Sequence, residues 1–143
     1  MSPSRIVIAT ALLGAIAAPG RSHGADARAQ LERGRYLVES VAMCQECHTP
    51  RDESGNLDRS RWLQGGLHGY RPLKPMAEWA DRAPALAGLP GWLDDEDVVY
   101  FLENGARRDG RSPRPPMKRF RMHAQDAKAV VAYLRSLKPL RAD

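Results

Sequence analysis

The chain has 143 residues, which fits a single domain. It carries 22 lysines and arginines against 17 aspartates and glutamates, a formal net charge of +5. These basic side chains are interspersed with acidic ones, so the charge does not indicate nucleic-acid binding. The sequence shows no grouping of acid–base or nucleophilic residues that would point to an enzyme.

Residues 1–24 have the form of a secretory signal peptide. Arg5 supplies a positive charge, residues 6–18 are small and aliphatic, and small residues follow. The apolar run is short for a membrane span, although an uncleaved anchor is the alternative. We expect cleavage after residue 24 or three residues later, which would leave a periplasmic domain of residues 25–143. Without Arg5 and Arg21, that domain has 20 basic and 17 acidic side chains, a net charge of +3.

Residues 25–41 are predicted to form the first helix of the mature chain. Leu31, Leu37 and Val38 contribute to a partial apolar face at helical spacing. Gly34 lies inside this helix, where glycine lowers stability relative to alanine. Either another helix approaches closely at Gly34, or the helix is weak and frays.

The next segment, CQECH, contains Cys44 and Cys47, the only cysteines in the chain. Its pattern C-x-x-C-H is the attachment signature of a c-type haem. Two thiols one turn apart can add to the two vinyl groups of one porphyrin, and His48 can then supply the proximal ligand of the iron. Attachment of this kind takes place outside the bacterial inner membrane, which agrees with an export signal.

Three other chemistries share part of this pattern. A thioredoxin-like dithiol would need a βαβ pattern, which is not visible, and would leave His48 unexplained. A zinc site needs a second pair of ligands, but His23, His68 and His123 are scattered along the chain. A disulfide between the two cysteines would be strained and would close almost no loop. The motif therefore favours a covalent haem.

Residues 49–93 are predicted to be mainly loop, because glycine, proline and turn signals recur in them. Apolar side chains in this region are expected to pack inward, against a haem; they are Trp62, Leu63, Leu67, Tyr70 and Leu73. A helix should follow, with Asp94 as its N-cap and Gly105 as its stop. A second helix is predicted over residues 124–138. Long loops are unusual in a compact domain unless something fills its middle, and a haem would do so.

Together these features resemble a class I c-type cytochrome of the periplasmic monohaem kind, from about Gly34 to Pro139. The resemblance rests on the haem motif with the following Thr-Pro, on residues 83–88, on the acidic helix and on Pro115-Pro116-Met117. It implies an all-α, cytochrome c-like fold. The N- and C-terminal helices would cross near Gly34 and Tyr133, and long loops would wrap around one haem. The pattern is similar to cytochrome subunits that take electrons from periplasmic dehydrogenases.

The same resemblance implies that Met117 matches the position of the distal iron ligand, opposite His48. A methionine thioether opposite an imidazole raises the reduction potential of the iron. Prolines lead into Met117, although a lysine follows it where a proline would be more usual. Met76, Met122, a histidine or an open position are the alternatives, and filling a gap in the core is the ordinary role of a methionine.

The resemblance implies an electron carrier rather than an enzyme. Such a protein would pass single electrons from a dehydrogenase to a downstream cytochrome or oxidase. A mildly basic surface suits an acidic face on a redox partner. The mature chain shows no transmembrane span, so any membrane association would run through a partner. The alternatives are a haem enzyme or gas sensor with an open sixth position, and a thiol–disulfide oxidoreductase.

Overall fold

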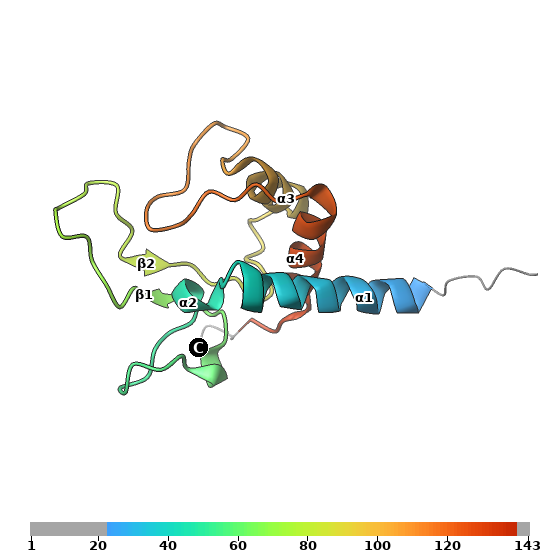
Figure 1. Ribbon diagram of the computed structural model, residues 1–143, viewed down its shortest axis with the longest axis horizontal. Coiled ribbons are helices and arrows are strands. Elements are labelled where there is room, and N and C mark those ends of the chain that lie inside the picture. The colour runs from blue at the N-terminus through green and yellow to red at the C-terminus, as the bar shows by residue number, and fades with distance from the viewer. Residues whose placement is uncertain (1–22, 140–143) are drawn as a thin grey trace, which may run out of the picture.

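The computed structural model describes residues 23–139, and its regular elements are mostly helical. Helix α1 (His23–Tyr36) passes into a π-helical turn, η1 (Leu37–Val41), and then into the short helix α2 (Gln45–His48). In Figure 1, α1 is the long blue helix and α2 lies just beyond its C-terminal end. The predicted first helix is therefore confirmed, with a change to π-helical geometry in its last five residues.

The remaining elements are short, apart from two helices. A 3-10 turn, η2 (Arg59–Arg61), precedes the strands β1 (Gly66–Leu67) and β2 (Arg82–Ala83), which pair antiparallel. Helices α3 (Asp95–Asn104) and α4 (Ala124–Ser136) follow. Within the described residues no helix is both long and apolar enough to span a membrane. The sequence patterns predicted both helices but not the two-stranded hairpin.

The expected signal peptide lies almost wholly outside the described residues. Residues 1–22 are not described, and α1 begins at His23. The proposed cleavage site and the mature domain of residues 25–143 therefore stay predictions.

Helices α1 and α4 cross at Gly34. A Cβ atom at this position would collide with the carbonyl oxygen of Ala129 and would lie 2.7 Å from Cβ of Tyr133. Beside the crossing, Arg33 and Asp126 form an ion pair with an N–O distance of 2.9 Å. The close approach of a second helix, rather than fraying, is thus the reason for the glycine, and the predicted crossing is confirmed.

The core lies between these helices and η1. Its buried side chains come mainly from α4 and η1, with contributions from α3 and the loops; they include Leu37, Val38, Leu63, Ala87, Leu102, Ala127, Val130, Val131 and Leu134. The ends of α3 are set as predicted. The side chain of Asp94 accepts a hydrogen bond from the backbone N–H of Glu96, and Gly105 ends the helix in the left-handed conformation at φ 63°.

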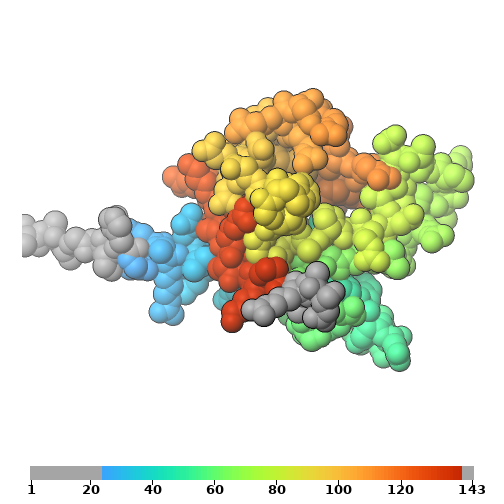
Figure 2. Space-filling model, turned by 180° about the vertical axis from the view of Figure 1, so that it is seen from behind, coloured from blue at the N-terminus to red at the C-terminus, as the bar shows by residue number. Residues whose placement is uncertain are grey.

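The loop between β1 and β2 projects away from the helices. It is yellow-green in Figures 1 and 2 and lies at the opposite end of the molecule from the start of α1. Leu67, Tyr70 and Leu73 on or beside this loop are not covered by other parts of the chain, whereas Leu63 is completely buried. Packing of the exposed three against a haem stays a prediction.

Candidate haem-attachment site

The motif sits on a sharp reversal of the chain after α1 and η1. Met43 has a φ of 53°, a left-handed conformation, and the N–H of Cys44 donates to the carbonyl of Val38 at 2.9 Å. The chain then forms the single turn α2, in which the N–H of His48 donates to the carbonyl of Cys44 at 3.0 Å. This turn brings both thiols, which are free, and the imidazole of His48 into one short helical segment.

The imidazole of His48 is held as the neutral ring with its proton on Nδ1, the form that metal ligation through Nε2 requires. Its side chain is buried, and Nδ1 lies 2.8 Å from the carbonyl oxygen of Pro84. A carbonyl oxygen can only accept, so Nδ1 carries the proton and Nε2 has a free lone pair. Burial also lowers the pKa of His48, which favours the neutral ring. The arrangement leaves Nε2 as a ready ligand for a metal ion.

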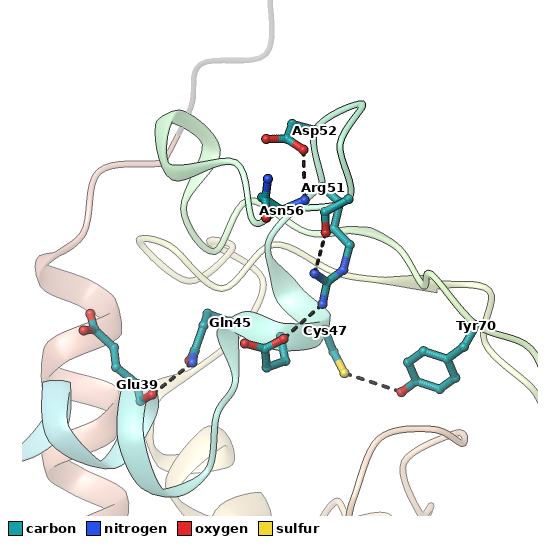
Figure 3. A network of polar contacts seen from close by, with 9 residues as sticks. Glu39, Gln45, Cys47, Arg51, Asp52, Asn56 and Tyr70 are labelled. Atoms are coloured by element: carbon teal, nitrogen blue, oxygen red, sulfur yellow. Dashed lines mark hydrogen bonds and ion pairs between the residues drawn. The ribbon is translucent and has the colours of Figure 1, made fainter.

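Other contacts hold the motif in place on both sides (Figure 3). Gln45 Nε2 donates to the carbonyl oxygen of Glu39 at 2.9 Å, and the carboxylate of Glu39 accepts from the hydroxyl of Tyr133 on α4. Toward the loops, Cys47 Sγ lies 3.7 Å from the hydroxyl of Tyr70. The segment that carries the motif therefore contacts α4 through Glu39 and the loop between β1 and β2 through Cys47.

The surroundings of the cysteines oppose two of the alternatives. Burial raises the pKa of the Cys44 thiol to about 11, whereas a thiol–disulfide oxidoreductase needs a readily formed thiolate. Within residues 23–139, no three side chains of the His, Cys, Asp and Glu types gather to hold a metal ion. A zinc site at this motif would need such a group.

Met117 is partly buried in the loop between α3 and α4. Its N–H donates to the carbonyl of Arg114 at 3.1 Å, which closes a turn around two prolines. The other two candidate methionines differ in their surroundings. Met122 packs against the hydrophobic core, and Met76 is exposed. Met117 is neither exposed nor part of the hydrophobic core.

Three aromatic side chains form a cluster that the sequence patterns did not single out. The Trp79 ring centroid lies 6.3 Å from that of His68 and 5.9 Å from that of Tyr70. His68 Nδ1 and Trp79 Nε1 are buried, and neither has a hydrogen-bond partner among the described residues. Buried polar atoms are rarely left unpaired, so a polar group of a bound cofactor fits this position. Two thiols that form no disulfide, an imidazole nitrogen with an available lone pair and these two unpaired polar atoms together suit a haem.

This combination of fold and motif defines a protein with covalently attached haem. Residues 31–138 match the Cytochrome c family, and the chain belongs to this family. A family member with one C-x-x-C-H motif carries one covalent haem c. Residues 31–138 therefore form a cytochrome c domain.

Curated relatives are similar to this chain over most of its length. A diheme cytochrome c-type protein of Cereibacter sphaeroides is 36% identical over 111 residues, which are 73% of this chain and 34% of that protein. The fructose dehydrogenase cytochrome subunit of Gluconobacter japonicus is 33% identical, covering 78% of this chain and 22% of the subunit. The gluconate 2-dehydrogenase cytochrome c subunit of Pantoea cypripedii is 33% identical, covering 75% of this chain and 26% of the subunit. The chain thus spans about a third of the first relative's length and about a quarter or less of the other two.

Proposed function

We propose that the haem is attached through thioether bonds to Cys44 and Cys47, with His48 as the proximal and Met117 as the distal iron ligand. Each bond would form by addition of one thiol across one vinyl group. The observation that carries the proposal is the imidazole of His48, which is buried and donates through Nδ1 to Pro84, so that Nε2 is available for the iron.

The haem supplies an iron that changes between Fe(II) and Fe(III), and the protein controls how readily it does so. The hydrogen bond to Pro84 keeps the ring of His48 in one orientation and increases its basicity as a ligand. The soft thioether of Met117 favours the reduced iron and so raises the potential.

We further propose that the protein works in the periplasm, after removal of residues 1–24, and takes electrons from a dehydrogenase. Two of the relatives are named as cytochrome subunits of dehydrogenases, which supports such a donor. A downstream cytochrome or an oxidase would be the acceptor. Co-purification with a dehydrogenase would distinguish a bound subunit from a free shuttle.

Substitution of Met117 tests the ligand assignment. In Met117→Ala we expect the weak far-red band of methionine-ligated Fe(III) to disappear and the reduced protein to bind carbon monoxide rapidly. The reduction potential should fall by on the order of 0.1 V, a fraction of the roughly 0.8 V that axial ligands span. Visible spectra, stopped-flow mixing and redox titration of the exported haem protein measure these changes.

Two matched variants complete this experiment. Met76→Ala and Met122→Leu each alter another methionine and should keep the far-red band. If the parent protein lacks this band, or if one of the two control variants loses it, the assignment of Met117 is wrong. Rapid carbon monoxide binding by the parent protein would instead indicate a haem enzyme or gas sensor.

A further inference from the structure

The loop that carries Met117 is bonded to the loop between β1 and β2 by Arg114 and by one main-chain hydrogen bond. Arg114 Nε donates to the carbonyl oxygen of Glu78 at 3.1 Å, and Arg114 Nη2 donates to that of Trp79 at 2.7 Å. Next to these bonds, the N–H of Ala80 donates to the carbonyl oxygen of Pro115 at 2.8 Å. Three consecutive residues of one loop are thus bonded to two consecutive residues of the other.

Arg114 also forms part of the turn that presents Met117. Its own carbonyl oxygen accepts the hydrogen bond from the N–H of Met117, and Pro115 and Pro116 lie between them. Because proline fixes φ, this short turn has few other conformations. A shift of Arg114 would therefore carry Met117 with it.

The other end of this connection reaches the attachment cysteines. Trp79, whose carbonyl accepts from Arg114, contacts the ring of Tyr70, and the hydroxyl of Tyr70 lies 3.7 Å from Cys47 Sγ. Figure 3 shows the contact between Tyr70 and Cys47. A continuous series of contacts thus links the Met117 turn to the haem-attachment motif.

Neighbouring arginines of the same loop do not make this link. Arg108 pairs with Asp97, and Arg111 pairs with Asp109 two residues away. By contrast, the guanidinium of Arg114 binds two successive main-chain carbonyls 35 and 36 residues away in the sequence. Its planar fork of N–H donors is suited to two adjacent acceptors, which a lysine ammonium serves less well.

We propose that Arg114 is a positioning residue for the distal ligand: by tying the Met117 turn to the loop between β1 and β2, it keeps the methionine–iron bond closed. The inference rests on the proposed ligation by Met117. Arg114 would not touch the iron or the haem; it would act on Met117 through the main chain of the two loops. Its effect is on the fraction of molecules in which Met117 has left the iron.

Carbon monoxide binding to the reduced protein reports this fraction. The ligand can bind only where Met117 has dissociated, so its rate is proportional to the population of that open form. Hydrogen bonds from a charged donor contribute measurably even on a surface, although water weakens them. In Arg114→Ala we expect carbon monoxide to bind about fivefold faster than in the parent, because the closed form loses both bonds.

The matched control is Arg111→Ala, which removes the same charge from the same loop but only an ion pair with Asp109. It should keep the rate of the parent. Arg114→Lys keeps the charge without the planar fork, and should bind carbon monoxide about twofold faster than the parent. In urea, the far-red band of both Arg114 variants should disappear before the helical circular dichroism signal, by a wider margin than in the parent.

The outcomes distinguish the assignment of Met117 as a ligand from the positioning role of Arg114. A parent protein without the far-red band would remove the Met117 assignment, and the role of Arg114 with it. A parent with the band, together with an Arg114→Ala variant that binds carbon monoxide at the parent's rate, would overturn the role of Arg114 alone. If Arg114→Ala yields no haem protein, the rate and urea profile of Arg114→Lys decide in the same way.

Discussion

The helices and the loops of this cytochrome c are held together in different ways. Where α4 packs against α1, η1 and α3, apolar side chains such as Val38, Ala127 and Val130 are buried almost completely. In the loops, many of the contacts between distant segments are hydrogen bonds to main-chain groups, and large apolar side chains such as Leu73 and Met76 are exposed. The helices thus form a packed frame, whereas the loops depend on directional bonds and, we propose, on the haem they surround.

The largest expected effect is at the tightest point of the frame. In Gly34→Ala the new Cβ would collide with the main chain of Ala129, which cannot move without shifting α4. We expect a loss of about 3 kcal/mol in the free energy of unfolding, measured by guanidinium titration. Gly91→Ala is the control, because a Cβ there meets nothing within 4 Å. Similar stability of the two variants would show that the crossing is looser than described.

A smaller effect is expected where a loop joins the frame. Thr49 is buried, and its Oγ1 accepts a hydrogen bond from the N–H of Leu63 at 3.0 Å. Thr49→Val keeps the shape but leaves that buried N–H without an acceptor, at an expected loss of about 2 kcal/mol. Thr49→Ser keeps the acceptor and loses only a methyl group, at about 1 kcal/mol. If serine proves more damaging than valine in guanidinium titrations, packing rather than hydrogen bonding holds this loop.

The smallest effect is expected at the surface of the frame. The hydrogen bond from Arg33 lowers the pKa of Asp126 below its ordinary value of 3.8. A carboxyl whose pKa is lowered by folding adds stability above its ordinary pKa, and this contribution is lost as the pH falls through the folded-state value. Arg33→Ala should therefore lower the melting temperature slightly at neutral pH and hardly at all in strong acid. A difference that persists in acid would mean that Arg33 acts by packing.

Local patterns in the sequence were enough to predict several parts of this protein. The spacing of two cysteines and a histidine predicted the attachment motif, and Asp94 and Gly105 marked the ends of α3. Gly34 lowers the stability of the helix that contains it, and this cost was one indication of the close helix crossing that the structure shows. The motif and the ends of α3 each depend on residues of one short segment, so a single sequence displays them, whereas the helix that crosses at Gly34 was implied by the family resemblance.

The tertiary structure alone decided which main-chain groups of the loops meet distant side chains. The carbonyl of Pro84 lies 36 residues beyond His48 and sets the protonation of its ring, and the bonds from Arg114 reach equally far. Their acceptors are main-chain carbonyls, which every residue has and which therefore leave no mark in the sequence. The sequence determined the haem chemistry and the helices by local spacing, while folding determined how the loops are aligned around that chemistry.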